Sequence, residues 1–143
     1  MRTVIGCRYK GIDKDYSIED LAAFHGHLGP FIVIGYRMGR YIRNNFCPDP
    51  FRLKAFVYCS GNPPESCIAD GVQIGSGCTF GKRNIEIVKS DEIKGEFIFG
   101  EKKLVIRPRP LELPKASGQD YDVAIEQFAE SLYYMPDSEL FVI

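Results

Sequence analysis

Several features that would identify a broad class of function are missing from this sequence. The formal net charge over 143 residues is only −1, whereas nucleic-acid binders usually carry a clear basic excess. No apolar run approaches the roughly 20 residues that cross a bilayer. The first residues lack the apolar core of about 7–15 residues found in a signal peptide. We therefore expect no nucleic-acid partner, no membrane insertion and a cytoplasmic location.

Paired cysteine motifs are also missing. The five cysteines are an odd number, and no Cys-x-x-Cys pair occurs among them. A disulfide scaffold is therefore not expected, and each thiol should be a core side chain, a metal ligand or a reactive group. Cys7 and Cys59 fit the core interpretation, because free cysteines are commonly buried.

Composition and periodicity predict one α+β domain over residues 1–143. With 45% hydrophobic and 26% charged residues, a chain of this length can bury a core of its own. Caps and apolar spacing predict helices from residue 18 to about 25, from 30 to about 45, from 65 to about 72 and from 120 to about 134. Strands are expected at residues 53–59, 85–89, 96–99, 104–107 and 140–143. This order indicates N-terminal helices, a mostly antiparallel sheet and a C-terminal helix.

Glycines mark two further features of the predicted fold. Gly35 and Gly39 lie one turn apart in the second helix. Each costs a helix roughly 1 kcal/mol, so we expect close backbone packing against this helix. Gly71 and Gly75 are expected to mark the passage from the predicted helix at about residue 72 into a loop that leads to the sheet.

The two histidines of the chain, His25 and His27, stand one residue apart. In a regular helix their side chains would diverge by roughly 200°. Gly26 and the Gly29-Pro30 pair predict that the helix has ended here, and in an extended segment residues i and i+2 face the same way. Two such imidazoles suit a metal site, or one ligand and one base. The alternative is one surface histidine and one capping histidine.

Cys67, Cys78 and Asp70 form a second candidate cluster. Cys67 lies in the first turn of the predicted short helix, where the positive end of the helix favours a thiolate. Asp70 follows one turn later on the same face. Glycines before Cys78 would let the chain bring this thiol back towards Cys67. The alternative is that both cysteines are small core residues.

The stretch from Gly75 to Lys82 invites comparison with a P-loop, which it does not match. Ser76 stands where the P-loop spacing needs glycine, and Arg83 stands where it needs serine or threonine. Lys82 and Arg83, with Gly77 in the same loop, remain candidates for binding an anionic group of a ligand. Solvated surface charges are the alternative interpretation.

Two motifs taken together resemble those of the FmdE family, which is named after formylmethanofuran dehydrogenase. The first is His-Gly-His-Leu-Gly-Pro at residues 25–30, followed by Gly-Tyr-Arg at 35–37. The second is Ser-Cys-Ile-Ala-Asp-Gly-Val-Gln at residues 66–73, followed by Ser-Gly-Cys-Thr-Phe-Gly-Lys-Arg-Asn at 76–84. The similarity covers about residues 17–110.

This resemblance implies an α+β core domain, usually a homodimer with exchanged elements. It also implies a site, often occupied by zinc or another divalent transition metal, at the His and Cys motifs. The family name comes from operons of the molybdenum or tungsten enzyme that reduces carbon dioxide onto methanofuran, so such an oxidoreductase is the expected partner. Many members have cysteine where this chain has Gly29. No cysteine follows Cys78, so the zinc finger that some members carry after the core is absent from this sequence.

Three hypotheses follow. In the first, His25, His27, Cys67 and Cys78 supply metal ligands, with Asp70 as an outer partner or a further ligand, and Cys67, His25 and Asp70 carry the chemistry. In the second, no metal is needed: Cys67 is a nucleophile or redox thiol, Cys78 resolves it and a histidine is the base. In the third, the protein binds a partner or ligand and carries out no chemistry.

Overall fold

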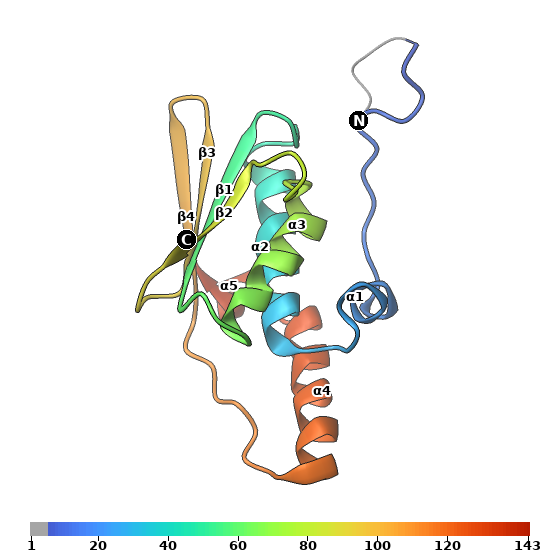
Figure 1. Cartoon of the computed structure of the whole chain (residues 1–143), viewed down its shortest axis with the longest axis vertical. Coiled ribbons are helices and arrows are strands. Elements are labelled where there is room, and N and C mark those ends of the chain that lie inside the picture. The colour runs from blue at the N-terminus through green and yellow to red at the C-terminus, as the bar shows by residue number, and fades with distance from the viewer. Residues whose placement is uncertain (1–5) are drawn as a thin grey trace.

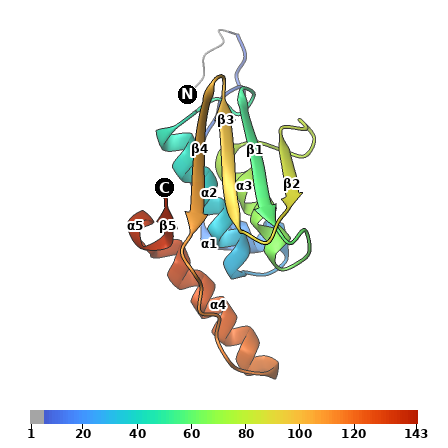
Figure 2. The same ribbon diagram turned by 90° about the vertical axis from the view of Figure 1, so that its left-hand side faces the viewer.

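A five-stranded sheet with helices on one face forms the centre of the molecule (Figures 1 and 2). The computed structural model describes residues 6–143. The strands are β1 Leu53–Cys59, β2 Ile85–Lys89, β3 Lys94–Phe99, β4 Lys102–Pro108 and β5 Phe141–Val142. The helices are α1 Ile18–His25, α2 Pro30–Asn45, the 3-10 turn η1 Glu65–Cys67, α3 Ile68–Ser76, α4 Gly118–Tyr134 and α5 Asp137–Leu140.

The strands are arranged in the order β2-β1-β3-β4-β5. β1 pairs with β2 in parallel, and the other three pairings are antiparallel. Parallel neighbours need a crossover connection, and α3 lies in the chain between β1 and β2. The inward side chains of β1 are Leu53, Ala55, Val57 and Cys59, all buried. The predicted α+β class, with N-terminal helices, a mostly antiparallel sheet and a C-terminal helix, is confirmed.

Glycines on α2 and α3 bring the two helices into backbone contact. A Cβ added at Gly35 would overlap the carbonyl of Ile68, and one at Gly39 would lie 2.6 Å from the amide nitrogen of Ser76. The close packing predicted for Gly35 and Gly39 is therefore confirmed. Gly35 contacts the start of α3 and Gly39 contacts its end. The two helices therefore run parallel, and their N-termini lie at the same end.

The prediction that Gly71 and Gly75 mark the end of the helix and a following loop was wrong, because both lie within α3. A Cβ on Gly71 would overlap the backbone of α2 at Ile32 and Tyr36. The contact with α2 therefore outweighs the low helix propensity of glycine. It also extends the helix to Ser76, beyond the end that was expected at about Val72.

Local sequence signals explain why α1 ends before the histidine motif is complete. Ser17 accepts a hydrogen bond from the Asp20 backbone, and the Asp20 side chain accepts one in return from the Ser17 backbone. This capping box begins the helix. Gly26 closes it with a φ of 96°, a left-handed conformation that favours glycine. Pro30 then begins α2 at a position where no amide donor is needed.

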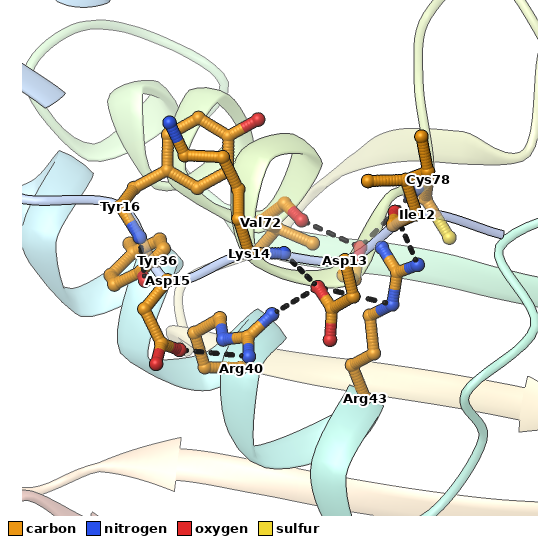
Figure 3. A network of polar contacts seen from close by, with 11 residues as sticks. Ile12, Asp13, Lys14, Asp15, Tyr16, Tyr36, Arg40, Arg43, Val72 and Cys78 are labelled. Atoms are coloured by element: carbon orange, nitrogen blue, oxygen red, sulfur yellow. Dashed lines mark hydrogen bonds and ion pairs between the residues drawn. The ribbon is translucent and has the colours of Figure 1, made fainter. Parts of the chain in front are cut away.

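The segment before α1 is tied to α2 by ion pairs (Figure 3). Arg40 bonds Asp13 at 2.7 Å and Asp15 at 2.9 Å, and Arg43 lies 3.6 Å from Asp13. Arg43 also donates a hydrogen bond to the carbonyl of Ile12. Cys7, which was expected in the core, is exposed, because it lies in this extended segment ahead of the first element.

The C-terminal helix α4 packs on α2 near its own C-terminus. Ala129 and Leu132 are buried, and Arg37 of α2 donates hydrogen bonds to the carbonyls of Leu132 and Tyr133. The N-terminal half of α4 projects beyond the end of the sheet (Figure 2). Among residues 6–143, no helix has both the length and the apolar character needed to cross a membrane.

Candidate functional site

The candidate site lies where the N-termini of α2 and α3 meet. The histidine motif immediately precedes α2, and Cys67 immediately precedes α3. Because the glycine contact holds the two helices parallel, these two stretches lie side by side although about 40 residues separate them in the sequence.

A close polar contact across the site joins His25 to Asp70. Nδ1 of the imidazole lies 2.9 Å from Oδ2 of the carboxylate. The His25 side chain is only 12% exposed, whereas that of Asp70 is 39% exposed. A carboxylate at Nδ1 orients the ring and leaves Nε2 as the free nitrogen. The structure thus brings together two of the residues predicted to act in one site.

His27 lies beside His25, with the two ring centroids 4.9 Å apart. The His27 ring also lies against Gly29: a Cβ at this glycine would be 3.1 Å from Cε1 of the ring. That distance is shorter than ordinary van der Waals contact. The ring therefore occupies space that a side chain at position 29 would need.

A cavity of about 190 Å³ joins the histidines to Cys67. His25, His27 and Cys67 all line it. Its remaining wall includes Tyr121 and Asp122 of α4. Sequence reasoning did not single out these two residues, because the signal in their helix is only its amphipathic spacing. Their place at the site follows from how α4 packs on α2.

The Cys67 thiol is not the activated thiolate that its position at a helix start predicted. Burial and then the nearby negative charge of Asp70 raise the pKa of Cys67 above its ordinary value. These two effects oppose the positive helix N-terminus, which would lower the pKa of the thiol. Cys67 therefore stays mainly protonated at neutral pH until a base, a metal or a bound ligand removes the proton.

The structure does not bring Cys78 to this site. The nine residues of α3 and then Gly77 separate Cys67 from Cys78. At helical rise the helix alone spans about 13 Å. Cys78 is fully buried and donates its S–H to the carbonyl of Leu53. Burial raises the pKa of its thiol to about 11. Figure 3 shows Cys78 near Arg43, at the far end of α3. This environment favours the core interpretation of Cys78.

Lys82 and Gly77 lie at the same far end. The Lys82 ammonium donates hydrogen bonds to the Gly77 carbonyl at 2.7 Å and to Oγ1 of Thr79 at 3.0 Å. Gly77 has a φ of 84° and ends α3. Burial lowers the pKa of Lys82. In this arrangement Lys82 stabilises its own loop, and it does not line either cavity beside Cys67.

The donor types at the site suit zinc, but one chain does not arrange them as a coordination shell. Two imidazoles and a thiol are preferred zinc ligands. Within residues 6–143, however, no three His, Cys, Asp or Glu side chains converge closely enough to hold a metal ion. A metal at this site would therefore need ligands from beyond the described part of one chain.

Two comparisons with known proteins found similar sequences. Residues 24–142 match a protein family described as "FmdE, Molybdenum formylmethanofuran dehydrogenase operon". The match includes both the histidine motif and Cys67. The chain is also 30% identical over 69 residues to a protein of Archaeoglobus fulgidus named "Probable S-adenosyl-L-methionine-binding protein". That alignment covers 43% of this chain but only 18% of the archaeal protein.

Proposed function

This chain belongs to the FmdE family, and on that premise we propose that it binds a divalent transition metal, zinc or a similar ion, at the cavity shared by His25, His27 and Cys67. The observation that carries the proposal is the 2.9 Å contact between Asp70 and Nδ1 of His25. A carboxylate behind an imidazole is the usual outer partner of a metal-bound histidine. It fixes the tautomer in which Nε2 can serve as a ligand.

The described chain would supply only part of the coordination shell. We propose that water, a bound small molecule or a second copy of the chain supplies the rest. A second copy is consistent with the homodimer that the family resemblance implies. A metal with an open position can polarise a bound oxygen or lower the pKa of bound water. In this arrangement His25, oriented by Asp70, and Cys67 hold the ion, and Tyr121 helps to enclose the cavity.

Cobalt titration of chelator-treated protein tests this proposal. A thiolate bound to Co²⁺ gives an intense charge-transfer band in the near ultraviolet, which reports cysteine ligation directly. We expect the band in the native protein and in Cys78→Ala, and its loss in Cys67→Ser. A band that survives Cys67→Ser, or no Co²⁺ binding by the native protein, would refute this ligand set.

A thiol nucleophile is the second candidate function. It is favoured by the position of Cys67, which lines the same cavity as His25 and lies one turn before Asp70. His25 would accept the thiol proton, and Asp70 would stabilise the resulting imidazolium. Cys78 takes no part, because a disulfide needs the two Cα atoms within about 7 Å. Metal-free protein in which His25→Ala slows alkylation of Cys67 would support this candidate over the metal site.

An accessory role beside a molybdenum or tungsten oxidoreductase is proposed from the family description alone. Within that role the chain would carry a metal or bind a ligand for the enzyme. Purification of the tagged chain from its own cells, followed by metal analysis of co-purifying proteins, tests this. Recovery of the chain without a molybdenum or tungsten enzyme would count against the accessory role and leave the metal site unaffected.

A further inference from the structure

A second, larger cavity begins at Cys67 and extends away from the histidines. Its volume is about 700 Å³, within the range of about 300–1,000 Å³ that is usual for small-molecule sites. Cys67 and Asp70 line its inner end, and Phe80, Arg83 and strand β2 line its outer part. Cys67 also lines the smaller cavity. Cys67 therefore lies between the cavity of the histidine pair and a space large enough for an organic ligand.

The outer wall is built by a tight turn that exposes an aromatic ring. Phe80 is 71% exposed, and the Arg83 guanidinium lies 5.5 Å from the centroid of its ring. The Arg83 amide donates to the Phe80 carbonyl at 3.1 Å. The Phe80 amide donates to the side chain of Gln73 on α3 at 2.8 Å. The bond to Gln73 ties the turn to α3, the helix that carries Asp70 and begins immediately after Cys67.

The backbone of Arg83 is strained. Its φ is 59°, and within residues 6–143 it is the only residue other than glycine with a positive φ. A residue with a Cβ rarely adopts this conformation, and such strain occurs often at ligand sites. The strained backbone presents the guanidinium at the edge of the cavity, over the Phe80 ring.

The charges along the cavity favour a ligand with one negative group. Asp70 is already bonded to His25, while Arg83 forms no ion pair with any carboxylate in the described part of the chain. Arginine matches a carboxylate through two parallel hydrogen bonds. Glu86 lines the same cavity and would repel a second negative charge. A group with a single negative charge, such as a carboxylate, is therefore a better match at this position than a doubly charged group such as a phosphate monoester.

We propose that this cavity binds a small planar molecule that carries one carboxylate. Its ring packs against Phe80, its carboxylate pairs with Arg83, and its other end lies at Cys67. This inference deepens the proposed function by naming a class of ligand. It rests on that function in one respect, which is that Cys67 is taken as the residue that acts at the inner end of the cavity.

Thiol labelling of Cys67 with two aromatic disulfides tests the carboxylate contact. The background is chelator-treated Cys7→Ser protein, because Cys7 is exposed while Cys47, Cys59 and Cys78 are buried. One reagent is 5,5′-dithiobis(2-nitrobenzoic acid), which bears one carboxylate on each ring. The other is 4,4′-dithiodipyridine, which is neutral. In both reactions the Cys67 thiolate attacks a sulfur and displaces an aromatic thiolate, so the ratio of the two rates is independent of the thiolate fraction.

We expect Arg83→Gln to lower the ratio of the carboxylate rate to the neutral rate by about threefold, the scale of one exposed ion pair. Arg83→Lys should restore part of the ratio, because it keeps the charge and the same backbone requirement but not the two parallel hydrogen bonds. The control is Arg52→Gln, since Arg52 is also an exposed cation over a phenylalanine ring, that of Phe99 at 5.0 Å. An unchanged ratio in Arg83→Gln, or an equal fall in Arg52→Gln, would overturn the inference.

Phe80→Ala tests the planar contact. It should slow both aromatic reagents several-fold while the small aliphatic reagent methyl methanethiosulfonate reacts as before. Phe51→Ala is the matched control, because Phe51 is 62% exposed beneath a lysine but does not line this cavity. Equal effects of Phe80→Ala and Phe51→Ala, or a Cys67 that reacts with none of the reagents, would also overturn the inference. Metal binding is measured separately, so failure here and failure of the metal proposal are distinguishable.

Discussion

Replacing Gly71 with alanine should destabilise the protein although alanine is the better helix former. In a free helix this change would gain about 1 kcal/mol. Here the added Cβ would overlap the backbone of Ile32 and Tyr36 and lie 2.8 Å from the carbonyl carbon of Gly35. All three obstacles are backbone atoms, so α2 and α3 must move apart. Overpacking of this kind costs about 1–3 kcal/mol and occasionally more. At about 3 kcal/mol, the net loss is about 2 kcal/mol.

Urea denaturation followed by circular dichroism measures this loss. Gly81→Ala is the control, because no atom lies within 4 Å of its added Cβ and its φ is not positive. This control should be neutral or slightly stabilising, since alanine lowers the entropy of the unfolded chain. Gly71→Ala should also weaken metal binding, because moving α3 withdraws Asp70 from His25. A Gly71→Ala protein as stable as the native chain would refute the packing argument.

Four further predictions concern three residues, Asp70, Cys78 and Asp13. Asp70→Asn should lower Zn²⁺ affinity about 10–100-fold, measured by competition with a chelating dye, because it removes the carboxylate behind the imidazole. In metal-free protein the same change should speed alkylation of Cys67 by iodoacetamide at neutral pH, because Asp70 helps to raise the pKa of that thiol; an equal or slower rate would contradict this. Cys78, with its pKa raised to about 11 mainly by burial, should resist the same reagent until the protein unfolds, and mass spectrometry of partly labelled protein would reveal any earlier reaction. Burial raises the pKa of Asp13, but the hydrogen bond from Arg40 and the nearby arginine charges outweigh burial, so its folded pKa lies below the ordinary value. The stability from this pair should be complete above the ordinary aspartate pKa and disappear as pH falls through the lowered one; an Asp13→Asn protein with the same pH dependence of unfolding as the native chain would contradict it.

The fold was predictable where local signals and tertiary packing agree. The capping box at Ser17, the proline at the start of α2 and the alternation along β1 all predicted the elements that the structure has. The α3 glycines were misjudged because a helix interior disfavours glycine locally. Only the parallel neighbour α2 explains Gly71 and Gly75, and no signal within their own stretch reveals that neighbour.

The candidate site was predictable only in part, again because local sequence signals do not reveal tertiary contacts. The first hypothesis from the sequence united the histidine motif and the Cys67 stretch in one site, and the structure places His25 against Asp70. It also suggested that Cys78 returns to Cys67, because glycines allow a turn. The longer helix places Cys78 at the opposite end instead. Tyr121 reaches the cavity through the packing of α4, which depends on contacts with residues far away in the sequence.

The measurement that tests the central claim most directly is the metal content of purified, unchelated protein, determined by elemental analysis beside Cys67→Ser and Cys78→Ala. The account predicts bound zinc or a similar ion in the native protein and in Cys78→Ala, and its loss in Cys67→Ser. Metal that is lost equally from Cys78→Ala, with that variant still folded, would contradict the ligand set. A native protein that carries no transition metal and takes none up would contradict the metal proposal itself.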